Sequence, residues 1–294
     1  MVKNNFYNDG RPIRFANIML DAWFKRAFGN PDKPRLTLLL LQLLLPERNI
    51  QEINILPSPE HVNPFPGGKD IRVDVECISG PDGSRFIVEM QLAKQADYYD
   101  RAVYYSSFAI QQQLDKGDIR FCFPPVYHIG ILNFALHPGE SRVLFRYNLQ
   151  EDTTHEIMTD HLNYLFLELP NGRVPDGTTD RINDFCYYLR EMANLQEEPE
   201  DVHDELLRLL FNSADYRIFS PEEKTRYEKD MTTERDRLNQ LDYARAEGRE
   251  KGLAEGREAQ QIETARRMLE KGYPAAEIAI LTGLTEEQVK QLGV

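Results

Sequence analysis

The sequence has little cysteine, no long apolar run and no excess of basic charge, and each shortage excludes a class of protein. The three cysteines, Cys77, Cys122 and Cys186, cannot all pair and show no metal-ligand spacing. We therefore expect free thiols and a reducing, cytoplasmic location. The most apolar run, Leu36 to Leu45, is far shorter than the roughly 20 residues that a bilayer requires, and it predicts a buried helix. The polar N-terminus predicts no export signal, so no membrane partner is expected.

Familiar catalytic patterns are also missing. The six histidines form no pair that suits a zinc site, and no Ser/His/Asp or Cys/His arrangement can be identified. No glycine-rich loop of the kind that holds nucleotide phosphates occurs, so we expect no organic cofactor.

The acidic charge is confined to one part of the chain. The net charge is −13, but residues 1–135 hold 15 basic and 15 acidic side chains, whereas residues 136–294 hold 20 and 33. The lack of a strongly basic surface argues against tight non-specific DNA binding. A neutral segment with acids in a metal site can still bind phosphate, because the metal supplies positive charge.

What the sequence does contain is a polar stripe on a predicted hairpin. Apolar residues alternate with polar ones from Ile71 to Cys77 and again from Phe86 to Leu92, with a glycine-rich turn between them. Asp74, Glu89 and Gln91 fall on the polar face, and neighbouring antiparallel strands bring such side chains to about 5 Å. Two carboxylates at this separation can share a Mg²⁺ ion, which accepts few protein ligands and keeps several waters. The alternative is that this face is only the solvated side of an edge hairpin.

The order of elements predicts an α/β fold with a mixed sheet flanked by helices, followed by a helical region and a long tail helix. We predict a core over residues 1–170, an acidic helical region over 171–233, and a glycine-striped helix with a terminal helix pair over 234–294. Tyr98, Tyr99 and Tyr104 are interpreted as core residues of the helix after the hairpin.

Several segments together resemble one family. Asp74 followed by Glu89-Met90-Gln91 resembles the pattern of PD-(D/E)XK nucleases, whose fold is restriction-endonuclease-like. The closest likeness is to the Rpn family of recombination-promoting nucleases and transposase-related proteins. Further segments that resemble this family are Asp21 to Gly29, the helix with Arg101, Tyr104 and Tyr105, the strand Phe166 to Pro170, and the repeated AEGRE of the tail.

The resemblance implies a metal-dependent DNA endonuclease that uses Mg²⁺, with Mn²⁺ as a substitute. Asp74 and Glu89 would bind the metal, and Gln91 stands where the wider superfamily usually has lysine. Glutamine can orient a water only by hydrogen bonds, so this departure weakens the case for catalysis.

The resemblance also implies roles for residues on two helices. Asp21 would complete the site, although a helix N-terminus favours an acid in any protein. Lys25, one turn later, would reach the scissile phosphate, and the alternative is a solvated lysine, which we slightly favour at this point. Arg101 and Tyr105 share one helical face and would contact the DNA backbone or support Glu89.

The tail predicts self-association. Gly248, Gly252 and Gly256 recur every four residues and lie on one helical stripe, each at a cost of about 1 kcal/mol relative to alanine. Close approach of a partner helix would offset that cost, so we expect a homo-oligomer. The terminal helix pair resembles a helix-turn-helix, but its second helix begins with Glu286 and Glu287, which favours packing over DNA reading.

Two other functions remain open. One is a nuclease fold that has lost catalysis and acts as a DNA-binding or oligomeric accessory. The other is an interaction protein whose tail is the working part.

Overall fold

The computed structural model describes residues 12–56, 60–61, 70–114, 120–177, 180–200 and 202–292. The N-terminal stretch on which the export-signal prediction rests lies outside these residues. The chain divides into two compact units, residues 1–228 and 229–294, and each is described by itself. In the part of the chain that is described, no helix is both long and apolar enough to cross a membrane.

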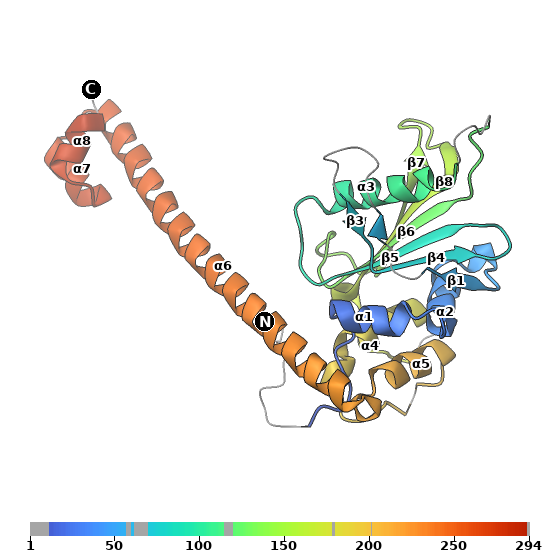
Figure 1. The fold of residues 1–294 in the computed structure, drawn as a ribbon. Coiled ribbons are helices and arrows are strands. Elements are labelled where there is room, and N and C mark those ends of the chain that lie inside the picture. Colours follow the sequence, from blue (N-terminus) through green and yellow to red (C-terminus); the bar gives the residue numbers. More distant parts are fainter. Residues whose placement is uncertain are drawn as a thin grey trace. The chain divides into compact units, whose positions relative to one another are not determined.

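A six-stranded mixed sheet forms the centre of the first unit, in the order β1-β4-β5-β6-β8-β7 (Figure 1). Its strands are β1 (Ile53–Ile55), β4 (Val75–Ser79), β5 (Arg85–Gln91), β6 (Val126–Leu132), β7 (Leu144–Gln150) and β8 (Ile157–Glu168). β5, β6 and β8 run parallel, and the other pairs are antiparallel. All seven residues of β6 are buried, as expected for a parallel strand that is covered on both faces.

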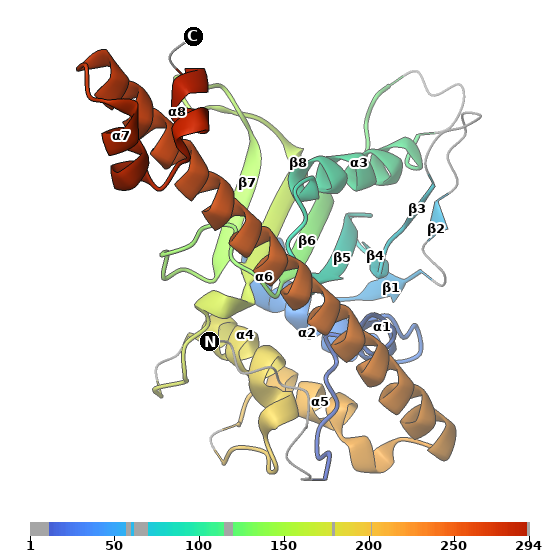
Figure 2. The same ribbon diagram turned by 90° about the vertical axis from the view of Figure 1, so that its left-hand side faces the viewer.

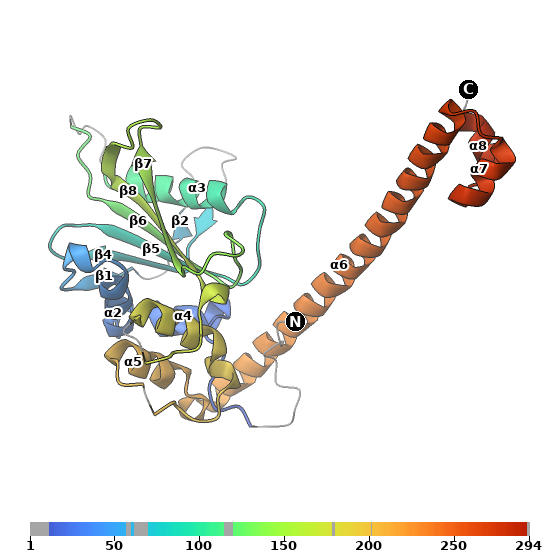
Figure 3. The same ribbon diagram turned by 180° about the vertical axis from the view of Figure 1, so that it is seen from behind.

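Helices cover both faces of this sheet (Figure 3). One face carries α3 (Tyr98–Gln111), and the other carries α1 (Asp21–Phe28), α2 (Arg35–Leu44), α4 (Arg181–Glu191) and α5 (Glu205–Ala214). Short 3₁₀ turns occur at Pro46–Arg48, Leu169–Asn171, Met192–Asn194 and Tyr216–Ile218. The expected α/β architecture of a mixed sheet flanked by helices is confirmed.

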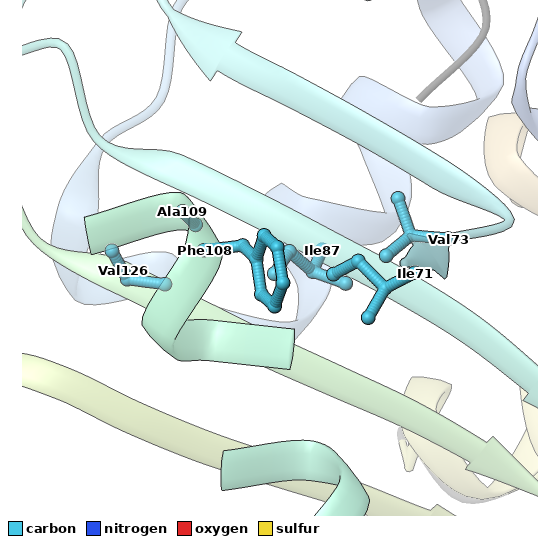
Figure 4. Close-up of a cluster of buried hydrophobic side chains, with 6 residues drawn as sticks. All are labelled: Ile71, Val73, Ile87, Phe108, Ala109 and Val126. Carbon is cyan, nitrogen blue, oxygen red and sulfur yellow. The ribbon is translucent and has the colours of Figure 1, made fainter. Parts of the chain in front are cut away.

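Apolar packing holds α3 on its face of the sheet. Phe108 and Ala109 of the helix meet Ile87 of β5 and Val126 of β6 in one buried cluster (Figure 4). Tyr104 and Tyr105, one helical turn before Phe108 and Ala109, pack against the same cluster, as the helical period requires. The helix is therefore fixed with its N-terminal residues over the carboxyl ends of β5 and β6.

The first strand of the predicted hairpin is broken. β3 (Ile71–Arg72) pairs with β2 (Glu60–His61) in a separate two-stranded sheet, and β4 begins only at Val75 (Figure 2). Ile71 and Val73 both pack with Ile87 in the cluster under α3, as a period of two requires. The β4–β5 register puts Glu76, and not Val75, opposite Ile87, so the alternation changes face between Val73 and Val75. Asp74 lies at the bend between the two strands.

The second unit consists of helices. α6 (Pro221–Glu270) runs through the boundary at residue 228, and α7 (Ala275–Thr282) and α8 (Glu286–Leu292) follow it. Ala265, Ile278, Leu284 and Val289 form the small core of this unit. A capping box begins α8, because the backbone N–H of Gln288 donates to Thr285 Oγ1 and the backbone N–H of Thr285 donates to Gln288 Oε1.

Candidate active site

The register of β4 and β5 places two carboxylates side by side. Val75 pairs with Val88, so the preceding residue, Asp74, lies opposite Glu89. The backbone N–H of Met90 donates to Asp74 Oδ2 at 2.9 Å and fixes the aspartate at the bend. The convergence that the alternation predicted is therefore present, although it arises at the end of the ladder.

Glu89 is buried in the middle of the sheet. Only 3% of the residue is exposed, because β5 has β4 on one side, β6 on the other and α3 above. Gln91 Nε2 donates to Glu89 Oε2 at 3.3 Å, whereas Glu89 Oε1 has no hydrogen-bond partner among the described residues. The alternative of a solvated edge hairpin is wrong for this position.

α1 brings a cation to these carboxylates. Lys25 Nζ lies 2.6 Å from Asp21 Oδ1 and 3.2 Å from Asp74 Oδ1, and its side chain is 31% exposed. Asp21 and Lys25 are one helical turn apart, so the helix itself brings these two side chains together. The solvated-lysine alternative, which the sequence slightly favoured, is wrong.

Burial and like charge set the protonation of the two carboxylates. Burial raises the pKa of Glu89, and the Asp74 charge raises it further against the opposing effect of Arg101. Burial likewise raises the pKa of Asp74, although the Met90 N–H and Lys25 partly offset it. Burial alone would lower the pKa of Lys25, but the two aspartates outweigh it and the pKa is raised. The site therefore disfavours two negative charges without a nearby cation.

Residues of α3 line the buried side of Glu89. Arg101 Nη1 donates to Gln95 Oε1 at 2.6 Å, and its guanidinium lies 5.6 Å from the centre of the Tyr98 ring and 5.7 Å from that of Tyr105. Burial and then the Glu89 charge raise the pKa of Tyr105. Arg101 and Tyr105 thus belong to the electrostatic environment of Glu89.

Of the tyrosines interpreted as core, two follow the prediction and one does not. Tyr98 is buried and extends over Gly130, where a Cβ would come within 1.8 Å of its hydroxyl oxygen. Tyr104 packs partly buried against the cluster under α3. Tyr99 is 46% exposed, because it is the neighbour of Tyr98 on the helix and points to a different side.

Asp74 and Glu89 fit a hard divalent cation. The part of the chain that the structure describes has no group of three or more His, Cys, Asp or Glu side chains that could hold a metal. Two carboxylates are nevertheless sufficient for Mg²⁺. Glu89 Oε1, which has no hydrogen-bond partner among the described residues, provides an oxygen ligand for the cation. The Lys25 ammonium beside Asp74 shows that positive charge is favoured here.

Other buried acids were missed by the sequence interpretation. Glu76, expected on the polar face, is fully buried and lies 3.0 Å from the Arg85 guanidinium. Glu168, at the end of β8, is also fully buried, and His137 Nδ1 lies 2.6 Å from its Oε1. The second pair lies 31 residues apart in sequence, and no local pattern marks it.

Comparison with known proteins places these residues in a family. Residues 18–244 match the model of the PD-(D/E)XK nuclease family transposases. A search of the curated proteins found no match, and a search of the solved structures found none either. The matched segment contains α1, the whole mixed sheet and both converging carboxylates. Because the match covers well over half of the 294 residues, the chain belongs to the PD-(D/E)XK nuclease family transposases.

Proposed function

We propose that this chain is a Mg²⁺-dependent endodeoxyribonuclease, with Mn²⁺ as a substitute, that acts in DNA recombination or in mobile-element biology. The observation that carries the proposal is Glu89, a carboxylate that is 3% exposed, lies opposite Asp74 and has one oxygen without a partner among the described residues. Burying such a group is costly unless it has a partner or a ligand. A divalent cation held by Asp74 and Glu89 meets this need.

Each residue of the site has a distinct task in this proposal. Asp74 and Glu89 hold the cation, which when bound lowers the pKa of a water and offsets charge on the phosphate. Lys25 supplies the ammonium that is missing at position 91, and it stabilises the charge that develops on the scissile phosphate. Gln91 orients water through its amide, and Asp21 holds Lys25 in place. Arg101 and Tyr105 support Glu89 and contact the DNA backbone.

The test is cleavage of supercoiled plasmid in Mg²⁺, Mn²⁺, Ca²⁺ or EDTA. We expect nicking in Mg²⁺ and Mn²⁺, none in EDTA, and complete loss with Asp74→Asn or Glu89→Gln. Lys25→Met should lower the rate roughly a hundredfold, as loss of one charge-stabilising donor does in other enzymes. Asp160→Asn removes a 75% exposed carboxylate from β8 and serves as the matched control.

A catalytically inactive accessory role is the second candidate. Glutamine at position 91 and the net charge of −13 favour it. Absence of cleavage of both single- and double-stranded DNA by folded protein in Mg²⁺ and Mn²⁺ would establish this second role. Loss of cleavage in Lys25→Met, with folding intact, would favour the active enzyme.

We also propose that the chain self-associates through α6, because two single-strand-cutting cores are needed to break a duplex. Gly248, Gly252 and Gly256 have no described atom within 4 Å of an added Cβ, so the stripe offers room for a second helix. Sedimentation velocity of the full chain tests this. Gly252→Ala should weaken association, whereas Glu250→Ala, on the opposite face of the same helix, should not. Unchanged association in Gly252→Ala would exclude contact through the stripe.

A further inference from the structure

A second polar group lies at the carboxyl ends of the parallel strands. The Glu168 carboxylate is fully buried at the end of β8, and its Oε1 lies 2.6 Å from His137 Nδ1. Its Oε2 accepts hydrogen bonds from the His137 backbone N–H at 3.3 Å and from Asn171 Nδ2 at 3.1 Å. The carboxylate therefore holds the imidazole in a fixed orientation.

The imidazole in turn fixes a tyrosine at the surface. His137 Nε2 lies 2.9 Å from the Tyr147 hydroxyl of β7. Burial and then the neighbouring Tyr99 hydroxyl raise the pKa of Tyr147, so the phenol stays protonated. With Nδ1–H donating to Glu168, Nε2 accepts a hydrogen bond from the Tyr147 O–H. Through His137, the buried Glu168 carboxylate thus helps to fix the Tyr147 ring, which is 36% exposed.

Tyr99 of α3 completes an exposed aromatic surface. Its ring centre lies 6.1 Å from that of Tyr147, and both rings pack on Phe166, at 5.7 and 5.4 Å. Tyr99 is 46% exposed. The two exposed rings, one from α3 and one from β7, therefore both pack on a buried ring of β8. We call Tyr99 and Tyr147 the tyrosine pair.

The tyrosine pair lies on the same sheet as the candidate active site. Glu89 pairs with Gly130, Gly130 with Phe166 and Phe166 with β7, so the strand that carries Tyr147 lies three strands from β5. At about 4.8 Å between strands, this is about 14 Å. A rise of roughly 3.4 Å per nucleotide in a duplex strand makes this about four nucleotides. One DNA strand can reach both places.

We propose that the tyrosine pair stacks an unpaired base of the DNA a few nucleotides from the cut, so that the substrate is single-stranded or locally unpaired DNA. The inference rests on the proposed function of the site. Base stacking on aromatic rings tolerates any sequence and does not depend on charge. It therefore suits a chain with a net charge of −13, in which phosphate contacts alone give weak attraction.

Glu168 and His137 act in this proposal as positioning residues. A buried carboxylate–imidazole pair is weak evidence for a purely stabilising role, because desolvation offsets much of the attraction. Here His137 Nε2 is hydrogen-bonded to the Tyr147 hydroxyl, and this bond restricts where the Tyr147 ring can lie. An ordered ring loses less conformational entropy when a base stacks on it.

The experiment measures binding of the full chain to fluorescein-labelled oligothymidylate and to a labelled hairpin duplex by fluorescence anisotropy, in EDTA so that no metal-dependent cleavage occurs. Tyr99→Leu and Tyr147→Leu should each weaken binding of the single strand about tenfold, the effect of losing one base–aromatic stack. Duplex binding should stay unchanged. Tyr99→Phe keeps the ring and should bind like the natural chain. Tyr243→Leu, at a 73% exposed tyrosine of α6, is the matched control.

His137→Asn tests the positioning role. It should weaken single-strand binding in the natural chain and have no further effect in Tyr147→Leu, because it acts only through that ring. Equal effects in both backgrounds would overturn the positioning role.

Binding of the single strand by both leucine variants at the level of Tyr243→Leu would overturn the proposal, as would equal weakening for single strand and duplex. These outcomes are separable from the fate of the nuclease assignment. If the natural chain cuts DNA and the leucine variants bind normally, only the stacking inference fails. If the natural chain does not cut and the variants lose single-strand binding, the stacking surface stands and the catalytic assignment fails.

Discussion

Charged residues have opposite surroundings in the sheet of the first unit and in the long helix of the second. In the sheet, Glu76 and Glu168 are fully buried and Glu89 is 3% exposed. Near the end of α6, the pair Glu263–Arg267 is solvated, with side chains that are 64% and 72% exposed. Solvated charges keep an isolated helix hydrated at little cost. A buried carboxylate needs a partner or a ligand, so the sheet acids carry information that the tail charges do not.

The buried acids of the sheet divide further into two kinds. Glu76 lies 3.0 Å from the Arg85 guanidinium, and Glu168 lies 2.6 Å from His137. Glu89 instead faces another carboxylate, and one of its oxygens has no partner in the described part of the chain. The first kind is satisfied within the fold. Under the proposed function, the second kind is satisfied when a cation binds, and this difference can be measured.

The largest expected effect is a contrast in stability between two similar substitutions. Glu76→Gln leaves the Arg85 guanidinium, whose side chain is 14% exposed, without its anion. We expect a loss of about 3–5 kcal/mol in the free energy of unfolding. Glu89→Gln removes a repulsion with Asp74 and should leave the free energy unchanged or raise it. Urea denaturation in EDTA measures both.

The two kinds of buried acid would not differ if Glu89→Gln lowered the free energy of unfolding as much as Glu76→Gln does. Glu89 would then be a structural partner like the other buried acids. Arg85→Met is the matched variant from the other side of the ion pair, and it should reproduce the loss seen in Glu76→Gln.

Metal binding should be the next largest effect. A cation that binds only the folded chain stabilises it by about 2.7 kcal/mol at a concentration one hundred times its dissociation constant. We expect Mg²⁺ to raise the melting temperature of the natural chain and of Asp160→Asn. Glu89→Gln and Asp74→Asn should not respond, and a Mg²⁺ response retained in both would place the ion elsewhere.

The pH dependence of stability without metal tests the same carboxylates independently. The pKa of Glu89 is raised in the folded chain, first by burial and then by Asp74. Its contribution is therefore fully present below the ordinary glutamate pKa of about 4.3 and is lost as the pH rises through the folded value. The loss is about 1.4 kcal/mol for each unit by which the pKa is raised.

Urea denaturation in EDTA at several pH values measures this effect as the difference between the natural chain and Glu89→Gln. That difference should fall as the pH rises. The same series in saturating Mg²⁺ should not show the fall, because the bound cation favours the ionised carboxylates. A difference that rises with pH in EDTA would mean that Glu89 has a favourable partner.

The sequence predicted the acids of the site but not their surroundings. Alternation identified β5 and placed Asp74 and Glu89 on one face, because side-chain direction in a strand repeats every two residues. It did not show that β5 lies in the centre of the sheet, since strand order depends on contacts with β6 that are distant in sequence. That position is what buries Glu89.

Helical spacing predicted only one of the two contacts of Lys25. Asp21 and Lys25 are four residues apart, so their meeting is local and predictable. The approach of Lys25 to Asp74 joins α1 to the bend before β4, and packing of the whole unit decides it. The break after Val73 escaped prediction because the apolar residues keep a period of two in the sequence, although the chain changes face between Val73, which enters the cluster under α3, and Val75. Tertiary packing there overrides the strand period.

The smallest expected effect lies in the tail. Glu263→Gln breaks the pair with Arg267 one helical turn away, where both side chains are mostly exposed. We expect a change below about 0.5 kcal/mol, because solvent screens the pair and holding it costs side-chain entropy. Circular dichroism during thermal melting of the full chain measures it. A loss comparable with that of Glu76→Gln would mean that the pair is buried in an assembly, which would make the solvated tail a contact surface.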